Sequence, residues 1–413
     1  MKPTDTIIIG GGQAGLAMSR CLTDEGIDHV VFERGRVAER WRSERWDSLR
    51  LLSPKWHSRL PGYAYRGDDP DGFMTMPEVV AYFEQYARSF SAPVQDETSV
   101  LSVKRAPEGG YRVRTNQGDW LAATVVVATG HCDTPFVPKA ARNLERGVHQ
   151  VVPSRYRNPG QLPDGGVLVV GASASGIQLA REIHRSGRPV TLAVGRHTRI
   201  PRRYRGRDIT WWLETSGMLS ERSDHAFNLE SARRQPSLQL VGTPDHQTID
   251  LGALQEEGVR LAGRVAGVDG TRVSFCGDLE RNIDAAEQKL DRVLGTIDGF
   301  IDETLMGAES PDRRPPIRVS GPPAELDLRD AGISTVLWAT GYRRQYPWLQ
   351  VPVLNMRGEI IHDGGVTNAP GLYALGLNFQ RTRKSSFIDG VGDDAQFVAE
   401  HLAHRFHRSS IAA

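Results

Sequence analysis

Two glycine-rich segments contain the residues of this sequence that are best suited to hold a reactive ligand. The first is Gly10-x-Gly12-x-x-Gly15, which follows the apolar run Thr6–Ile9 and opens a helical pattern. In such a loop the first glycine permits a tight turn, the second lets the backbone approach a pyrophosphate, and the third lets helix and strand pack closely. The helix that follows offers free N–H groups and a partial positive charge to an anion. The segment therefore predicts a dinucleotide site.

An acidic residue indicates which nucleotide this first loop takes. Glu33 follows His29–Phe32, the second expected strand of a strand–turn–helix–strand unit. A carboxylate at this place accepts hydrogen bonds from the adenosine ribose hydroxyls and repels a 2′-phosphate. We therefore expect FAD or NAD, and not NADP, in the first loop.

The second loop repeats the pattern with one change. Gly171-x-Ser173-x-x-Gly176 lies between the apolar run Val167–Val170 and a helical pattern, and Ser173 adds a hydroxyl donor for phosphate. No acid follows the next expected strand; the residues there are basic, namely Arg196, Arg199, Arg202, Arg203 and Arg205. Because a guanidinium binds a phosphate through two hydrogen bonds, the second loop predicts NADPH. Arg196 is the first candidate for the 2′-phosphate, whereas the later arginines fit a solvated loop equally well.

Two such units in one chain predict the fold class. We expect an α/β protein with two doubly wound, Rossmann-like dinucleotide-binding domains, the NADP domain being inserted in the FAD domain. The expected boundaries are 1–155 for the first part of the FAD domain, 160–330 for the NADP domain with an irregular insertion, and 331–413 for the second part of the FAD domain.

The composition of the chain argues against a nucleic-acid or membrane partner. The 413 residues carry a net charge of +1, with 39% hydrophobic and 24% charged residues, which are ordinary globular values. Nothing in this balance requires a nucleic acid. We find no signal-peptide pattern and no apolar run of about 18 residues, and we therefore expect neither a membrane partner nor export from the cytoplasm.

The cysteines and histidines exclude two further kinds of site. Cys21, Cys132 and Cys276 are far apart in the sequence and form no C-x-x-C pair, which argues against a redox dithiol or a zinc knuckle and agrees with a reducing cytoplasm. His401, His404 and His407 share the expected terminal helix, where a solvated helix end is the more frequent reason for such a pattern. We expect no metal.

These motifs together resemble those of the class B flavoprotein monooxygenases, which include flavin-containing monooxygenases, Baeyer–Villiger monooxygenases and the auxin-forming plant enzymes. The resemblance covers nearly the whole chain. It rests on both glycine loops with Glu33, on Ala128-Thr129-Gly130 followed by Pro135 and Pro138, on Ala339-Thr340-Gly341-Tyr342, and on the closing run from Gly371 to Gly392.

The resemblance implies that NADPH reduces FAD and that the reduced flavin reacts with O2. A C4a-(hydro)peroxyflavin then inserts one oxygen atom into a nitrogen, sulfur or carbonyl carbon of a small organic substrate. The cofactor supplies this chemistry, and the protein positions the reactants and excludes competing reactions. The sequence does not decide the oligomeric state, and a homodimer is one alternative.

Two departures from the family pattern leave other activities open. The family carries an F-x-G-x-x-x-H sequence between its domains, whereas this chain has Gly147 and His149 without the phenylalanine. Many relatives have an asparagine shortly after the first Ala-Thr-Gly segment, where this chain has Asp133-Thr134. The alternatives are an NADPH:acceptor oxidoreductase without oxygen insertion and a flavin-binding sensor.

The candidate site residues follow from these motifs. No catalytic residue is identified, and Thr134 and Ser53 are kept as candidates. A tryptophan of the linker after Glu33 is expected beside the flavin, although ordinary packing explains it equally well. The full set expected to bind cofactors is Gly10, Gly12, Gln13, Ala14, Gly15, Glu33, Trp41, Val100, Gly130, Gly171, Ser173, Ser175, Gly176, Arg196, Arg203, Thr340, Gly341 and Gly390.

Overall fold

The first of two parallel sheets begins at the N-terminus. The computed structural model describes residues 1–311, 315–319 and 321–411. The sheet has the strand order β21-β22-β23-β8-β1-β2-β5, and β7 pairs with both β8 and β6. Its inner strands from β23 to β5 are parallel, and their apolar runs fit a sheet that is covered on both faces. The strands are β1 (Lys2–Ile9), β2 (His29–Phe32), β5 (Val94–Gln95), β6 (Val100–Arg105), β7 (Tyr111–Thr115), β8 (Gly118–Val127), β21 (His362–Asp363), β22 (Val366–Thr367) and β23 (Leu372–Ala374).

The second sheet is parallel throughout and has the order β10-β19-β11-β12-β15. Its strands are β10 (His149–Val151), β11 (Gly166–Val170), β12 (Val190–Ala193), β15 (Arg260–Ala262) and β19 (Ile333–Trp338). A small antiparallel sheet follows β15 in the chain, formed by β16 (Val265–Asp269), β17 (Arg272–Phe275) and β18 (Glu325–Asp327). The predicted fold class, with two doubly wound units, is confirmed.

Two strands lie in a different sheet from the one that the expected boundaries gave them. Ile333–Trp338 was expected in the second part of the FAD domain, but it pairs with β10 and β11 in the second sheet. His149–Val151 was expected in the first part, and it also pairs in the second sheet. The chain therefore leaves the first sheet after β8, before residue 149, and returns to it after Trp338. Since an apolar strand fits either parallel sheet, its pattern alone does not say which sheet it joins.

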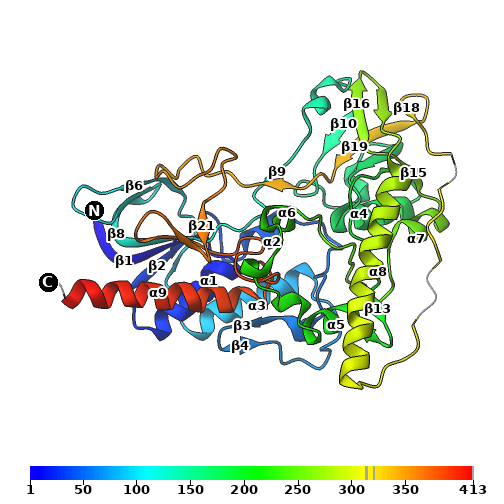
Figure 1. Cartoon of the computed structure of the whole chain (residues 1–413). Helices are drawn as coiled ribbons and strands as arrows, with labels where there is room; N and C mark the ends of the chain where they lie inside the picture. The colour runs from blue at the N-terminus through cyan, green and yellow to red at the C-terminus, as the bar shows by residue number, and fades with distance from the viewer. Residues whose placement is uncertain (312–314, 320, 412–413) are drawn as a thin grey trace.

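Helices cover both sheets (Figure 1). On the first, α1 (Gln13–Asp24) packs beside α9 (Val391–Ile411) and against α3 (Met76–Ser89), and α4 (Ala174–Arg185) packs on the second next to α7 (Leu251–Glu256). Thr75 caps α3 by a reciprocal contact with Glu78, whereas neither α1 nor α4 has a side-chain cap. Both α1 and α4 begin at a glycine loop, so the N–H groups of their first turns have no side-chain acceptor. Within the described residues, we find no helix with the length and apolar character that crossing a bilayer requires.

Residues 195–250 form an inserted segment between β12 and α7. It contains the hairpin β13 (Arg203–Tyr204) and β14 (Arg207–Asp208), then α5 (Ile209–Thr215), η4 (Met218–Ser220), η5 (Ser223–His225) and α6 (Leu229–Arg233). Trp212 and its apolar neighbours pack against the long helix α8 (Leu279–Thr304), which stands at the right of Figure 1.

The inserted segment also binds the loop that precedes α9. The N–H of Ser223 donates to Arg381 O at 2.8 Å, and the N–H of Lys384 donates to Leu219 O at 3.2 Å. An antiparallel bridge between Arg222 and Thr382 lies between these bonds. A segment that leaves the second sheet is thus joined to the C-terminal part of the first unit.

Short elements connect the larger ones. They are α2 (Glu39–Ser43), η1 (Lys55–His57), β3 (Arg59–Leu60), β4 (Tyr63–Ala64), β9 (Thr134–Pro135), η2 (Lys139–Asn143), η3 (Pro159–Gln161) and β20 (Tyr342–Arg343).

Candidate cofactor sites

The geometry of the first loop explains each of its glycines. Gly10 has a φ of +112°, and a Cβ there would lie 2.6 Å from the carbonyl oxygen of Ala128. A Cβ on Gly15 would lie 1.8 Å from Gly10 O, whereas a Cβ on Gly12 would meet nothing within 4 Å. Packing therefore requires the outer glycines, and the middle one faces open space. This space, beside the uncapped N–H groups of α1, fits a pyrophosphate.

Glu33 lies where the adenosine end of such a ligand belongs. Its side chain is buried, and its two carboxylate oxygens accept the N–H groups of Gly11 at 2.7 Å and Gly35 at 3.1 Å. The N–H of Thr98 donates to Glu33 O, which brings Val100, the first residue of β6, close to this strand end. A hollow beside Glu33 is lined by Arg34, Gly35, Arg36, Glu39, Ser43, Glu44 and Glu97.

The second loop has nearly the same geometry. Gly171 has a φ of +108°, and a Cβ there would lie 2.3 Å from Ala339 O. A Cβ on Gly176 would lie 1.8 Å from Gly171 O. Ser173 stands at the N-cap of α4, but its hydroxyl makes no capping hydrogen bond. Both Ser173 and Ser175 are half-buried at this helix end, and a phosphate bound there stays our expectation for them.

The arginines after β12 differ in what they already bind. Arg196 is exposed and forms no hydrogen bond or ion pair that the described residues reveal. Arg199 and Arg202 are buried in ion pairs, with Asp250 and Asp208 among their partners. Arg203 donates to Gly206 O at 2.7 Å within its own hairpin, and nothing in the structure links it to the second loop.

Arg264 is a basic residue of this site that sequence reasoning missed. Its Cδ lies 3.7 Å from the position of a Cβ on Gly195, because β12 and β15 are neighbouring strands. Asp278 holds its side chain at 3.3 Å. The short strand β15 gave no signal strong enough to place Arg264 beside Arg196.

We expect Arg196→Ala to raise the KM for NADPH about 10- to 100-fold and to change the KM for NADH little, because only NADPH carries the 2′-phosphate. The rate of flavin reduction at a series of nucleotide concentrations measures this effect. Arg203→Ala is the matched control. Equal losses for both nucleotides would show that Arg196 does not bind the phosphate.

The two Ala-Thr-Gly segments occupy equivalent places in the two sheets. Ala128 and Ala339 follow β8 and β19, and their carbonyls contact the first glycine of each loop. Gly130 and Gly341 have φ values of +74° and +88°, which glycine adopts without strain. As the motifs predict, each segment ends a strand where the chain crosses between sheets.

The two crossing segments pair with each other. β9 and β20 are antiparallel, and Thr134 lies opposite Arg343. The Thr340 hydroxyl donates to Phe136 O. Thr134 lies 3.5 Å from the Asp133 carboxylate, which forms an ion pair with Arg40. Thr134 is therefore at the crossing between the units.

Other expected residues are placed by packing. Trp41 stacks on Phe83 of α3 with ring centroids 6.5 Å apart. The guanidinium of Arg45 lies over the Trp41 ring, 5.1 Å from its centroid. Ser53 is half-buried in the linker next to Leu52, whose carbonyl accepts from Arg202 at 2.6 Å. His149 is exposed on the edge strand β10, so it lines neither loop.

The loop before α9 reaches the start of α1. Gln13 donates through Nε2 to Ser386 O at 2.7 Å, and a Cβ on Gly376 would lie 2.7 Å from the Cβ of Ala14. A Cβ on Gly390 would lie 2.0 Å from Lys384 O. Gly390 is thus required by the tight packing of this loop, beside the first loop.

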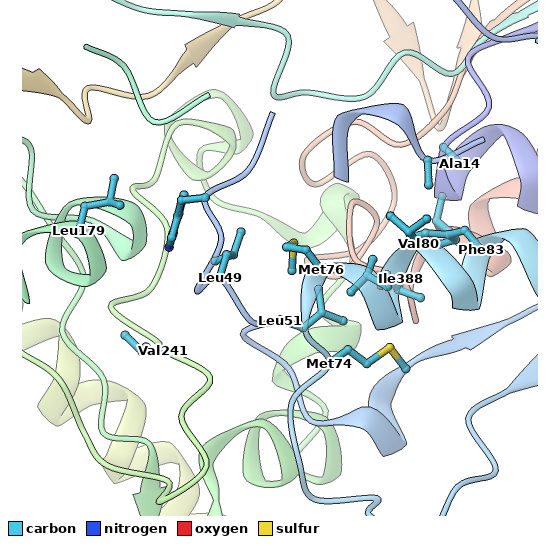
Figure 2. Close-up of a cluster of buried hydrophobic side chains, with 14 of the residues drawn as sticks. Ala14, Leu49, Leu51, Met74, Met76, Val80, Phe83, Leu179, Val241 and Ile388 are labelled. Carbon is cyan, nitrogen blue, oxygen red and sulfur yellow. The ribbon is translucent and has the colours of Figure 1, made fainter. Parts of the chain in front are cut away.

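Apolar side chains fill the region between the two nucleotide loops. Leu49, Leu51, Met74 and Met76 are buried, and they lie between Ala14 of α1 and Leu179 of α4 (Figure 2). Val241 of the inserted segment belongs to the same cluster. These side chains form one continuous apolar cluster from α1 to α4.

A cluster of charged side chains includes Lys384 and Asp389 of the loop before α9. His57, Glu214 and Asp389 have potential ligand atoms within 4.8 Å of one another. Lys384 Nζ lies 2.9 Å from the carboxylate of Glu214 and 2.8 Å from that of Asp389, and Arg59 pairs with both. Contact with His57 and then Lys384 lowers the pKa of Glu214 to about 2. Because two cations of the chain already neutralise the carboxylates, we interpret the cluster as an ion-pair network.

The buried carboxyl of Asp394 should make the free energy of unfolding depend on pH. It is fully buried in the first turn of α9, and burial raises its pKa to about 7 against smaller opposing effects of Ser385 and Arg381. A folded-state pKa above the unfolded value means that stability is present at low pH and is lost as pH rises from about 4 to 7. We expect Asp394→Asn to raise the free energy of unfolding by about 1–3 kcal/mol at pH 8 and to change it little at pH 4.

Thermal unfolding across this pH range measures the effect of Asp394→Asn. Glu400→Gln, at an exposed position of the same helix, is the control and should leave the pH profile unchanged. A stability profile of the Asp394 variant that runs parallel to the wild type would contradict the assignment.

Two uncapped helix N-termini, each behind a glycine loop on its own parallel sheet, define a two-dinucleotide flavoprotein. A family model described as pyridine nucleotide-disulphide oxidoreductase matches residues 7–216. The chain belongs to this family and is an oxidoreductase. Its cofactors are FAD and NADPH, as expected, and the open space at Gly12 and the free hydroxyl of Ser173 fit their phosphates.

Known proteins extend this comparison. An uncharacterized CzcO-like oxidoreductase of Geobacillus kaustophilus is 34% identical over 401 residues, which cover 96% of this chain and 98% of the relative. The indole-3-pyruvate monooxygenase YUCCA1 of Oryza sativa is 27% identical and covers 96% of this chain and 90% of its own length. The flavin-containing monooxygenase from Stenotrophomonas maltophilia has the same fold, with a TM-score of 0.68 at 19% identity over 98% of this chain and 99% of that one. The resemblance to flavoprotein monooxygenases is confirmed.

Proposed function

We propose that this protein is an FAD-dependent monooxygenase that NADPH reduces and that inserts one oxygen atom of O2 into a small organic substrate, at nitrogen, sulfur or a carbonyl carbon. The observation that carries the proposal is the combination of two nucleotide sites with three separate thiols. Cys21, Cys132 and Cys276 are all free, and burial raises the pKa of Cys21 to about 12. Electrons that reach the flavin therefore have no disulfide of this chain to reduce, and their acceptor is external.

Each part of the chain has a place in this proposal. Glu33 and the start of α1 hold the flavin nucleotide, and the start of α4 with Arg196 holds NADPH. When bound, FAD would accept the hydride of NADPH and supply the oxygen chemistry, which the resemblance assigns to a C4a-(hydro)peroxyflavin. The apolar residues between the loops, Leu49, Leu51, Met74 and Met76, exclude water from the reacting region, which oxygen transfer requires.

The names of the relatives agree with this reaction class, because both the rice protein and the Stenotrophomonas protein are called monooxygenases. Three unpaired thiols favour a reducing compartment such as the cytoplasm. One observation favours a second candidate, an NADPH:acceptor oxidoreductase. The monooxygenase pattern has an asparagine where this chain has Asp133-Thr134, at the crossing between the units. It also has a histidine between the domains, and His149 of this chain is exposed on an edge strand.

Rapid mixing separates the two candidates. The holoenzyme is reduced with NADPH without oxygen and is then mixed with O2 while flavin absorbance is recorded. A transient flavin–oxygen adduct that precedes the oxidised flavin supports the monooxygenase. Direct return to oxidised flavin with stoichiometric H2O2, in the presence of amine, thioether and ketone substrates, overturns it. Fast reoxidation by a quinone without H2O2 would then support the second candidate.

A further inference from the structure

Gln239 of the inserted segment contacts the loop that binds NADPH. Its side chain is only 1% exposed, and Nε2 donates to the carbonyl oxygen of Ala172 at 2.6 Å. Ala172 is the second residue of the loop Gly171–Gly176. The other end of the same amide, Oε1, is buried and has no hydrogen-bond partner among the described residues. A buried amide oxygen without a donor is costly, and such groups in folded proteins usually have a partner.

The surrounding backbone fixes the position of this amide. The N–H of Gln239 donates to Thr198 O at 2.9 Å, and Leu238 forms a parallel bridge with Thr198. Gln239 therefore lies alongside the chain that leaves β12, at Thr198, which is two residues after Arg196. Its side chain spans from this strand end to the glycine loop. In a dinucleotide-binding unit these two features flank the adenosine ribose.

The first unit shows what a side chain does at this place. There Glu33 stands at the strand end and its carboxylate contacts Gly11, the loop residue that corresponds to Ala172. We expect its oxygens also to accept hydrogen bonds from the ribose hydroxyls of FAD. The second unit has Gly195 and Arg196 at the strand end and no acid. A carboxylate would repel a 2′-phosphate, whereas an amide oxygen accepts a hydrogen bond without carrying charge.

We propose that Gln239 is a specificity-determining residue of the NADPH site, whose Oε1 accepts a hydrogen bond from the free ribose hydroxyl of the adenosine half. The inserted segment thereby supplies a neutral acceptor in place of the acid that the second unit lacks. The proposal rests on the assignment of NADPH to the loop Gly171–Gly176. It adds to Arg196, which binds the phosphate, a residue that binds the sugar next to it.

Two variants of Gln239 separate the acceptor from the loop contact. Gln239→Met and Gln239→Glu both remove the Nε2 donor to Ala172, but only Gln239→Glu keeps an acceptor oxygen and adds a charge. The dissociation constants of NADP+ and NAD+ are measured by titrating the flavin absorbance of the oxidised holoenzyme at pH 8. We expect Gln239→Met to weaken both nucleotides alike, about 3- to 10-fold. We expect Gln239→Glu to weaken NADP+ by about tenfold or more and to leave NAD+ near the wild-type value.

Two outcomes overturn the proposal. If Gln239→Glu weakens NADP+ and NAD+ equally, or if Gln239→Met changes neither, then Gln239 only supports the Ala172 carbonyl. The FAD content and the melting temperature of each variant show whether it has folded. Arg196→Ala, titrated with adenosine 2′,5′-bisphosphate, distinguishes the failure of the underlying assignment. If that variant binds the bisphosphate as the wild type does, Arg196 does not bind the 2′-phosphate; if the wild type itself does not bind the bisphosphate, the assignment of NADPH to the second loop fails, and the proposal for Gln239 fails with it.

Discussion

A variant with Gly176→Ala is expected to keep its FAD and to lose reduction by NADPH. The new Cβ would lie 1.8 Å from Gly171 O, and since the contact is with backbone, no side-chain rotation relieves it. The loop and the start of α4 must separate, which misplaces the N–H groups that meet the pyrophosphate. We expect the affinity for NADPH to fall by about 100-fold or more, because the strain is confined to the nucleotide site.

The visible absorbance of FAD and the rate of anaerobic reduction measure the two halves of this prediction. Gly295→Ala is the matched control, because a Cβ on Gly295 in α8 would meet nothing within 4 Å. It should alter neither quantity. A Gly176 variant that is reduced at the wild-type rate would mean that NADPH does not bind at the loop of α4.

Gly12→Ala is expected to give a folded protein that binds FAD poorly. A Cβ on Gly12 would meet nothing within 4 Å of the protein, so the fold tolerates the methyl group. The same methyl group would occupy the space that the FAD pyrophosphate needs at the start of α1. We expect a loss of FAD affinity of about 100-fold.

The ratio of FAD to protein after purification and the dissociation constant of added FAD measure this loss. Circular dichroism of the protein freed of FAD tests the fold, because that melting temperature should equal that of the wild type without FAD. Gly147→Ala, where a Cβ also meets nothing within 4 Å, is the control with normal FAD content. Full FAD occupancy in the Gly12 variant would contradict the pyrophosphate site.

The glycine loops and the fold class were predictable from sequence because they depend on contacts between residues close in the chain. Gly10, Gly12 and Gly15 lie within one turn, and the acid Glu33 ends the next strand of the same unit. The placement of β10 and β19 was wrong for a physical reason. An apolar strand such as Ile333–Trp338 can lie in either parallel sheet, and its partner β11 is far away in the sequence.

The residues that sequence reasoning missed come from segments without periodicity. Gln239 and Arg264 follow no regular apolar pattern. Gln239 contacts the second loop and Arg264 lies beside Gly195 only because the chain returns to β12 from a distant point. Arg202 was counted with the phosphate-binding arginines, but it is buried against Asp208. An arginine in an ion pair and an arginine free to bind a ligand look alike in a sequence, since the distinction depends on a distant carboxylate.

The bonds between the inserted segment and the loop before α9 bear on how this enzyme could be recombined with its relatives. Ser223 and Lys384 belong to different nucleotide-binding units, yet they take part in one antiparallel contact. A chimaera cut at the crossing segments would exchange residues 219–223 and leave residues 380–384 behind. Such a hybrid would also separate the position of Glu214 from its partners Arg59 and Lys384, which lie in the first unit. The exchangeable module is therefore the second unit together with the loop before α9, rather than the second unit alone.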